Sequence, residues 1–453
     1  MQASDLRTLL DLDRAHLLHP ITEFRKHEVK GPRIVTGGEG IWLELADGRR
    51  VIDGLSGLFN INVGHGRREI ADAVAKQMRE IAYYPAFWDF STESAIRLAE
   101  RIAGLLPADR RLSHLLFTSG GSDANEAAFR VARHYHAVRG RPQRNKILSR
   151  RHAFHGITRA AGSATRLPVY HALAGVDPAH VETAAPYCFR CEFGKTQPGC
   201  GMPCVEEVAR SIEREGADSI AAMIVEPVQG TGGILVPPPD YFARLQAICR
   251  EHDVLLILDE VITGFGRTGR WFGMQHWDIH PDIVTFAKGV TSGYLPLGGF
   301  ALSDSVYAAL RDEGPPGLPF MFGLTYNNHA TACAAALANL EIVEREGLVA
   351  NAHAVGEQLR KRLEEGLGSH PKVADIRGIG LLLAVECTQP GTLAPVDGRP
   401  MAYPAAIAAR CWERGLIVRA LWENVALAPP LCTTPEEADR IADILIEAFE
   451  QVG

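Results

Sequence analysis

Short apolar runs alternate with longer amphipathic segments between about Leu112 and Leu302. The nearly continuous apolar runs predict strands that are buried on both faces of a mostly parallel sheet, and they read HLLFTS, NKILSR, SIAAMIVEP, DVLLILDE, DIVTFAKG and LGGFALS. Two intervening segments, ANEAAFRVARHYHAVRG and DYFARLQAICREHD, repeat apolar residues every three or four positions. They predict helices long enough to connect parallel strands. We therefore expect this part of the chain to form a large α/β domain.

The pattern changes after Thr325. It predicts a long alanine-rich helix, then strands around GIGLLLAVEC and LIVRALWENVALAPPL, and a closing helix. The closing helix is expected to begin at Thr434, Pro435 and Glu437, which have the order of an N-cap, a first helical proline and a capping-box partner. The expected division of the chain is 1–65 for an N-terminal segment that joins the small domain, 66–324 for the large domain and 325–453 for a small α+β domain.

The composition excludes several classes of protein. With 453 residues, of which 46% are hydrophobic and 22% are charged, the chain can bury a core and is too long for a small disulfide scaffold. The net charge of -7, without a basic tail, argues against nucleic acid as a partner. No apolar run approaches the roughly 20 residues of a membrane span, and the acidic, amphipathic N-terminus is unlike a signal peptide. We expect a cytoplasmic protein with no membrane partner and mostly reduced cysteines.

Three polar sites follow strands of the predicted sheet. Asp259 comes directly after VLLIL and Lys288 follows DIVTFA, which places a carboxylate and an amine at the carboxyl edge, where ligands bind in open α/β sheets. The third site is the turn Ser119–Ser122 between the strand HLLFT and a helix, where free N–H groups and the helix dipole can hold a phosphate. Pyridoxal 5′-phosphate suits all three sites, because it offers a protonated ring nitrogen, an aldehyde that a lysine can bind as a Schiff base, and a phosphate.

Each site alone has an ordinary explanation, as a turn residue, a solvated lysine or a helix cap. Together, the segments LLILDEVITGFGRTGRWFG and AKGVTSGYLPLGG resemble the signature of the class III pyridoxal-phosphate aminotransferases. The resemblance extends from about Pro20 to the C-terminus and includes, in family order, DGLSGLFNINVGHG, TSGGSDANEAAFRVAR, HAFHGIT, VEPVQGTGG, FGLTYNNHATACAAA and ALAPPLCTT. It implies a fold-type I transferase, an α/β fold whose large domain contains a mostly parallel sheet beside a smaller α+β domain.

The resemblance implies roles for the residues around the cofactor. Lys288 would form the Schiff base and then move the proton between the substrate's α-carbon and the cofactor. Asp259 would keep the ring nitrogen protonated, so that the ring withdraws electrons. Gly121 and Ser122 would bind the phosphate. Thr325 would reach the same phosphate from a neighbouring subunit, so we expect a homodimer or a higher assembly.

Two side chains would lie against the ring of the cofactor. Phe154, in HAFHG, takes the position of the aromatic that stacks on one face, and Val261 would lie against the other face. Many relatives have tyrosine at the position of Phe154, so a hydroxyl contact is missing here. The alternative for Phe154 is an ordinary core aromatic.

The substrate side of the site resembles one branch of the family. Ile262 stands where ornithine and 4-aminobutyrate enzymes tend to have glutamine, and the segment around Arg419 resembles the part of amine:pyruvate enzymes that carries a mobile arginine. Arg419 would clamp the carboxylate of a keto acid and swing away for an apolar donor, unless it is a surface arginine. Four further residues match positions that line the substrate pocket in relatives, namely Leu58, Phe59, Phe87 and Trp88. They are equally plausible as residues of the hydrophobic core.

The expected activity is ping-pong transfer of an amino group from an amine or amino acid to a keto acid, with pyruvate as the expected acceptor. A glutamate-1-semialdehyde aminomutase and a dialkylglycine decarboxylase have the same apparatus and remain alternatives, as does a silent protein that binds only the cofactor or a metal. The transamination itself needs no metal. Four cysteines nevertheless lie close together in the sequence with the spacing C-x₂-C-x₈-C-x₃-C, namely Cys188, Cys191, Cys200 and Cys204. This spacing is compatible with a zinc knot, with disulfides or with free thiols.

Overall fold

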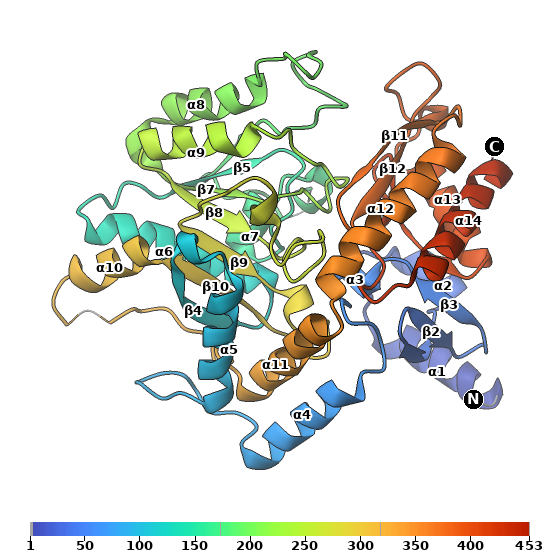
Figure 1. Ribbon diagram of the computed structural model, residues 1–453, viewed down its shortest axis with the longest axis horizontal. Helices are drawn as coiled ribbons and strands as arrows, with labels where there is room; N and C mark the ends of the chain where they lie inside the picture. The colour runs from blue at the N-terminus through green and yellow to red at the C-terminus, as the bar shows by residue number, and fades with distance from the viewer. Residues whose placement is uncertain (1–2, 173, 318, 453) are drawn as a thin grey trace.

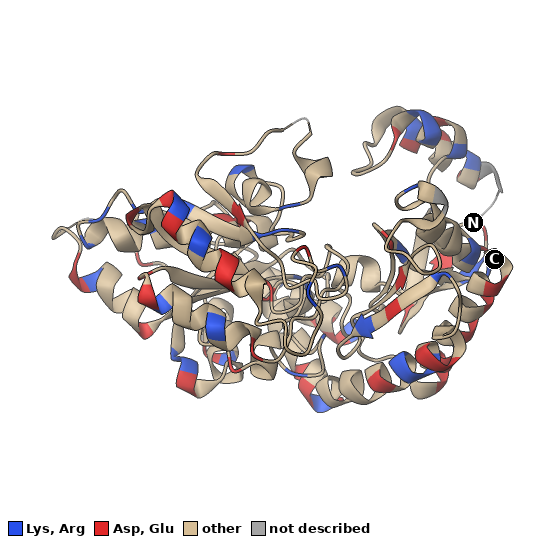
Figure 2. Cartoon of the chain, turned by 90° about the horizontal axis from the view of Figure 1, so that it is seen from above, with Lys and Arg blue, Asp and Glu red and all other residues tan. Residues whose placement is uncertain are grey.

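The computed structural model describes residues 3–172, 174–317 and 319–452 of the protein. Two lobes lie side by side, and both ends of the chain lie in the same lobe (Figure 1). Lysine and arginine are interspersed with aspartate and glutamate on the outer helices of both lobes (Figure 2). None of the described helices combines the length and the apolar character needed to span a membrane.

A seven-stranded sheet forms the centre of the larger lobe, in the strand order β4-β10-β9-β8-β7-β5-β6. From β9 to β6 the strands are parallel, whereas β10 is antiparallel to both of its neighbours. The apolar pattern predicted these strands except β6, an edge strand with the short, half-polar sequence HVET. The bounds are Leu112–Thr118 (β4), Lys146–Arg150 (β5), His180–Thr183 (β6), Ile220–Val225 (β7), Leu255–Asp259 (β8), Ile283–Phe286 (β9) and Gly298–Ser303 (β10).

Helices cover both faces of this sheet because its central strands are apolar on both faces. Along β8, Leu256 and Leu258 belong to one buried cluster with residues of α5, α8 and α9, while Leu255 and Ile257 belong to another with residues of α6 and α7. This is the alternation that a strand imposes on its side chains. The predicted connecting helices are present as α6 and α9. The bounds are Glu93–Leu105 (α5), Gly121–Val138 (α6), Arg159–Ala164 (α7), Pro203–Glu215 (α8) and Tyr241–Glu251 (α9).

Two four-stranded sheets lie in the smaller lobe. One combines distant parts of the chain, because β13 pairs in parallel with β3. The other, in the order β11-β12-β15-β14, is antiparallel. The strands predicted around GIGLLLAVEC and LIVRALWENVALAPPL are present in these sheets. The bounds are Val35–Glu39 (β1), Trp42–Leu45 (β2), Arg50–Asp53 (β3), Val373–Gly378 (β11), Leu383–Cys387 (β12), Leu416–Ile417 (β13), Arg419–Leu421 (β14) and Asn424–Leu427 (β15).

The alanine-rich helix and the closing helix are present as α11 and α14. The capping box of α14 is confirmed, because the Glu437 N–H donates to Thr434 Oγ1 (3.2 Å) and the Thr434 N–H donates to the Glu437 carboxylate (3.0 Å). In the smaller lobe, one buried cluster contains Ile41 and Ile52 from the N-terminal part of the chain together with residues of α12 and α14. The domain boundaries at residues 65 and 324 stay a prediction. The remaining bounds are Ala3–His16 (α1), Phe24–Lys30 (α2), Ser56–Phe59 (α3), Arg68–Glu80 (α4), Asp304–Asp312 (α10), Ala330–Arg345 (α11), Leu348–Leu367 (α12), Ala402–Glu413 (α13) and Pro435–Val452 (α14).

Candidate active site

Asp259 and Lys288 lie on neighbouring parallel strands at the carboxyl edge of the large sheet. Asp259 is the last residue of β8 and pairs with Thr285 of β9. Lys288 lies just beyond the end of β9 and begins a short 3₁₀ turn, with a φ of +49°. A left-handed φ is uncommon for a residue other than glycine, and such backbone strain is concentrated at functional sites. The strand pairing therefore brings a carboxylate and an amine to one edge of the sheet.

The amine of Lys288 lies in surroundings that favour its neutral form. Burial lowers the pKa of Lys288 to about 8. The carboxylates of Asp259 and Glu226 raise this pKa, but they offset the effect of burial only in part. The guanidinium groups of Arg419 and Arg267 lower it further. Because the Lys288 side chain is still partly exposed, it can act as a nucleophile toward a carbonyl compound near neutral pH.

Hydrogen bonds hold the carboxylate of Asp259 in one orientation. Asn125 Nδ2, on α6, donates to Asp259 Oδ2 (2.8 Å), and His155 donates to the same oxygen when its proton is on Nδ1 (2.8 Å). The Val261 N–H donates to Oδ1 (3.0 Å). Asn125 is itself fixed, because its Oδ1 accepts a hydrogen bond from Thr285 Oγ1 (2.6 Å). Three donors thus fix the position of the Asp259 carboxyl group, which is 3% exposed.

The N-terminus of α6 lies against both the end of β8 and the loop that follows β5. A Cβ on Gly121 would lie 3.0 Å from Val261 Cγ1, so glycine permits this close approach. Gly156, with a φ of +127°, lies against Ser122, where an added Cβ would lie 2.5 Å from the hydroxyl oxygen. The same hydroxyl oxygen accepts a hydrogen bond from the Ile157 N–H (3.3 Å). The first N–H groups of α6 have no intrahelical partners, so an anion bound at this helix end can accept hydrogen bonds from them.

Phe154 and Val261 lie on two segments that meet at this edge, and both are partly exposed. Glu226 fixes the backbone at Phe154, because its Oε1 accepts a hydrogen bond from the Phe154 N–H (3.1 Å) while its Oε2 accepts one from the Gly230 N–H (2.9 Å). The Phe154 ring packs edge-on against Tyr170, with the ring centroids 5.4 Å apart. Burial raises the pKa of Glu226, which is 3% exposed. Glu226 therefore positions the loop that carries the predicted ring-stacking residue.

Sequence reasoning assigned no role to Asn125, His155 or Glu226, although the family motifs contain all three. Asn125 lies four residues after Gly121 in α6, so the two residues share a face of the helix. His155 lies in HAFHG, beside the residue predicted to stack on the ring. Glu226 comes directly after the last residue of β7, much as Asp259 is the last residue of β8. Position relative to a strand end or a helix start was the signal that could have identified them.

Arg419 lies at the start of β14 and is partly exposed. Within the described part of the chain its guanidinium makes no hydrogen bond and no ion pair, yet it is near enough to Lys288 to lower the pKa of that amine. Arg267 acts on Lys288 too, but it donates to neutral acceptors such as Ser56 Oγ (3.0 Å) and Asn62 Oδ1 (2.9 Å). Burial lowers the pKa of Arg267 to about 9, and its side chain is enclosed. Of these two guanidinium groups, that of Arg419 is thus partly exposed and without a described partner, whereas that of Arg267 is enclosed and already hydrogen-bonded.

Phe59 lies beside the amine of Lys288. The Lys288 Nζ lies 5.5 Å from the centroid of the Phe59 ring, which is buried, while the neighbouring Leu58 is 54% exposed. Phe59 belongs to a buried cluster with Ile262 and with Leu421 of β14. This cluster connects the surroundings of the amine to the strand on which Arg419 lies.

Phe87, Trp88 and Thr325 lie together in a different part of the chain. The rings of Phe87 and Trp88 are 5.6 Å apart, and Phe87 lies so close to Gly323 that an added Cβ there would meet its ring at 2.5 Å. The carbonyl of Thr325 accepts a hydrogen bond from the Tyr83 hydroxyl. Trp88 is 82% exposed, and Thr325 is exposed as well. None of the contacts described for Phe87, Trp88 and Thr325 joins them to the site around the amine.

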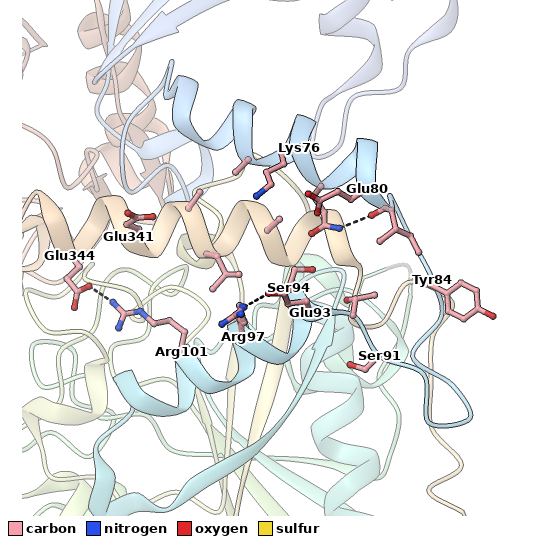
Figure 3. Close-up of a pocket in the computed structure, with 17 residues that line it drawn as sticks. Lys76, Glu80, Tyr84, Ser91, Glu93, Ser94, Arg97, Arg101, Glu341 and Glu344 are labelled. Carbon is pink, nitrogen blue, oxygen red and sulfur yellow. Dashed lines mark hydrogen bonds and ion pairs between the residues drawn. The ribbon is translucent and has the colours of Figure 1, made fainter.

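A groove of about 890 Å³ lies between α4, α5 and α11 (Figure 3). Charged side chains point into it from all three helices, among them Lys76 from α4 and Glu341 from α11. Arg101 and Glu344 form an ion pair there, so much of this charge is already neutralised. The groove is lined by none of the residues that the sequence assigned to cofactor or substrate.

The residues at the sheet edge fit pyridoxal 5′-phosphate. The N-terminus of α6 offers N–H donors to a phosphate, and Asp259 offers an oriented carboxylate to a protonated ring nitrogen. Lys288 offers an amine with a lowered pKa to an aldehyde. The close approach of Gly121 to Val261 brings the phosphate end of this arrangement next to the strand that carries Asp259. The residues therefore match the cofactor at its phosphate, its ring nitrogen and its aldehyde.

Comparison with known proteins gives the same family. Residues 24–449 match the family described as Aminotransferase class-III. The chain is 40% identical to the diaminobutyrate–2-oxoglutarate transaminase of Halomonas elongata, with 96% of this chain and 94% of that protein covered, and 35% identical to the putrescine–pyruvate aminotransferase of Pseudomonas aeruginosa, with 98% and 96% covered. The solved ω-transaminase from Pseudomonas jessenii in complex with PMP matches with a TM-score of 0.93, at 32% identity over 98% of each chain. The chain belongs to the class III aminotransferases, which transfer amino groups with the help of pyridoxal phosphate.

Proposed function

We propose that the enzyme moves an amino group from an amine or amino acid to a keto acid with a single carboxylate, pyruvate above all, in a ping-pong cycle. The observation that carries this proposal is the guanidinium of Arg419, which makes no described hydrogen bond or ion pair and lies near the amine of Lys288. Arginine binds a carboxylate through two parallel N–H bonds. Its place beside the reacting amine suits a substrate that carries a carboxylate next to a carbonyl.

The chain's own groups would each hold or move one part of the reaction. Pyridoxal phosphate, when bound, supplies an aldehyde that takes up the amino group and a ring that withdraws electrons. Gly121 and Ser122 would hold its phosphate at the start of α6, and Asp259 would hold the proton on the ring nitrogen. Lys288, with a pKa of about 8, would carry a proton between the donor's α-carbon and the cofactor's C4′ atom.

The ring of the cofactor would lie between Phe154 and Val261. Both side chains are partly exposed at the edge of the sheet, where an aromatic and a β-branched residue can cover opposite faces of a flat ring. The hydrogen bonds of Glu226 fix the loop on the Phe154 side, and the bond from the Val261 N–H to Asp259 fixes the other side. This arrangement would restrict rotation of the ring during proton transfer.

The charge near the amine supports an acceptor with one carboxylate. Arg419 can pair with one carboxylate, whereas Arg267 is enclosed and already donates to neutral acceptors. A second buried carboxylate, as in 2-oxoglutarate, would need a further cation, and without one its burial costs several kcal/mol. The relatives differ on this point, because the Halomonas enzyme is named for 2-oxoglutarate and the Pseudomonas aeruginosa enzyme for pyruvate. Leu58 and Phe59 would offer an apolar wall to the donor when Arg419 swings away.

A homodimer would explain why part of the predicted site lies apart from the amine. Phe87 is partly exposed and Trp88 and Thr325 are exposed, although the family resemblance assigns the first two to the substrate pocket and Thr325 to the phosphate. A second copy of the chain would bring these residues to the site, and the groove of Figure 3 offers a surface for that copy. Mixing inactive Lys288→Ala chains with Thr325→Ala chains should then restore activity, because one site of the mixed dimer has both native residues. Failure of such mixtures to recover activity, with mixed dimers present, would contradict a shared site.

Arg419→Ala tests the acceptor, with each half-reaction measured separately. We expect the half-reaction with pyruvate to lose about 2 to 4 kcal/mol of transition-state stabilisation, while a donor amine without a carboxylate reacts at nearly its original rate. Arg419→Lys is the matched control, because it keeps the charge without the paired donors and should lose less. Equal losses in both halves would show that Arg419 supports the fold and that another residue binds the carboxylate.

Product analysis separates the other activities. An amine donor should bleach the visible absorbance of the bound cofactor and yield a carbonyl product, which a silent binding protein would not do. An aminomutase would release no keto acid from the donor, and a decarboxylase would release carbon dioxide. A comparison of pyruvate with 2-oxoglutarate as acceptors then decides whether one carboxylate or two suit the site.

A further inference from the structure

A long irregular loop, residues 184–202, connects β6 to α8 and carries most of a four-cysteine set. Irregular loops of this length are uncommon in compact domains unless a function or a cross-link holds them. The last cysteine is the second residue of α8. The transamination machinery uses none of the four, which are Cys188, Cys191, Cys200 and Cys204 in the spacing C-x₂-C-x₈-C-x₃-C.

The four thiols converge on one small cavity. All of them line a space of about 20 Å³, which is large enough for one water molecule or one metal ion. Cys188 interacts electrostatically with Cys191 and Cys200, and Cys204 interacts with Cys188 and Cys191. None of the four forms a disulfide. The fold of the loop thus places four potential metal ligands along the walls of one small cavity.

Hydrogen-bond donors are directed at one of the sulfur atoms. The Gln197 side-chain amide donates to Cys200 Sγ (2.9 Å), and the Met202 N–H donates to the same sulfur (3.3 Å). Cys204 lies in the first turn of α8, and burial raises the pKa of its thiol to about 11, so a metal ion has to displace the proton as it binds. The thiolate is the form of cysteine that binds metals, and donors to sulfur orient and stabilise the ligands of such sites.

We propose that these four cysteines bind one zinc ion, with each thiol releasing a proton to solvent as its sulfur bonds to the metal. Four cysteines in tetrahedral geometry are a standard structural zinc site, and zinc needs no oxidant or reductant to bind. The sulfurs are not already gathered within 4.8 Å of one another, whereas zinc–sulfur bonds of about 2.3 Å place them about 3.8 Å apart. Binding therefore draws the loop closed, which couples metal affinity to the order of the loop.

The same loop joins the two lobes. Tyr187, next to the first cysteine, donates a hydrogen bond to Glu386 Oε2 of β12 (2.5 Å), and Arg190 forms an ion pair with the same carboxylate. Glu386 is completely buried and also forms an ion pair with Arg377, so loss of Tyr187 and Arg190 would leave it with one of its three described side-chain partners. A zinc ion at the base of the loop would hold both side chains against β12. The metal thus has a structural role, and its loss should lower thermal stability more than the rate of transamination.

Metal analysis of the untagged holoenzyme tests the proposal. We expect the holoenzyme to contain about one zinc ion per chain. When Co²⁺ replaces zinc, we expect about one cobalt ion per chain and a strong absorption from thiolate-to-cobalt charge transfer. The double variant Cys200→Ser/Cys204→Ser should lose both signals. Cys432→Ser is the matched control, because Cys432 is partly exposed but lies outside the loop, and it should keep them. Retention of the cofactor's visible absorbance checks that each variant is folded, and Cys191→Ser offers a milder variant if the double one is not.

Three outcomes would overturn the proposal. The first is a holoenzyme that contains no zinc when isolated and takes up none after reduction and incubation with Zn²⁺. The second is an unchanged zinc content in a folded variant of the loop cysteines, which would mark the metal as bound elsewhere. The third is a pair of disulfides among these cysteines that forms in place of metal binding, as shown by the intact mass and by titration of free thiols.

Discussion

Replacement of Asn125 by alanine tests whether the orientation of Asp259 limits catalysis. Asn125 Nδ2 donates to the Asp259 carboxylate at 2.8 Å, and both residues are almost wholly buried. Loss of one hydrogen bond to a charged group costs about 1.5 to 3 kcal/mol, which corresponds to roughly a 10- to 150-fold slower half-reaction if the cost falls on the transition state. The bonds from His155 and Val261 remain, so the carboxylate is loosened and not lost. We therefore expect slower chemistry with the cofactor still bound.

The assay follows the visible absorbance of the holoenzyme after it is mixed with an amine donor, with cofactor occupancy measured separately. Thr285→Val is the matched control, because it removes the hydroxyl that donates to Asn125 (2.6 Å) and leaves the bond to Asp259 in place. Its rate should fall less than that of Asn125→Ala. An unchanged rate for Asn125→Ala at full occupancy would refute the reasoning. A loss that follows only from a lower melting temperature would refute it as well.

Three further predictions concern the amine and the carboxylate. Lys288→Ala should abolish turnover while circular dichroism and phosphate-dependent cofactor retention stay normal, and a variant that still turns over would contradict the assigned role. Asp259→Asn should slow both half-reactions far more than it weakens cofactor affinity, whereas the opposite order would identify the residue as a structural cap. Cofactor-free protein should take up pyridoxal phosphate at a rate that rises with pH, reaches half of its maximum near pH 8 and levels off about one pH unit higher, because only the neutral amine attacks and burial lowers the pKa of Lys288 to about 8. A rate that still rises near pH 10 would indicate an ordinary lysine.

The positions of Asp259 and Lys288 could be predicted because the end of a strand is encoded locally. Each residue follows a continuous apolar run, and the two runs form neighbouring parallel strands in which Asp259 opposes Thr285. The short edge strand β6 lacks such a run, and the sequence of β10 does not reveal that it is antiparallel. Apolar pattern therefore predicts that a strand exists and where it ends, while strand direction depends on the connections that follow it.

The partners of these residues were harder to predict because their contacts span long separations in sequence. Arg419 approaches the amine from another sheet, and only the resemblance to amine:pyruvate enzymes indicated it. Asn125, His155 and Glu226 are polar residues in a helix or after a strand, where local pattern favours a surface or a cap. Tertiary packing decides which polar groups are buried and which donors satisfy them. A local pattern does not record that choice.

The different surroundings of Asp259 and Lys288 explain how one edge of the large sheet can suit both the ring nitrogen and the aldehyde of the cofactor. Burial disfavours charge on either group. At Asp259 three hydrogen-bond donors hold the carboxyl group in one position, where it can face a protonated ring nitrogen. At Lys288 two guanidinium groups add to the effect of burial, while the two carboxylates offset it only in part. If the amine were surrounded by acceptors as the carboxylate is by donors, Lys288 would remain charged and could not attack a carbonyl group.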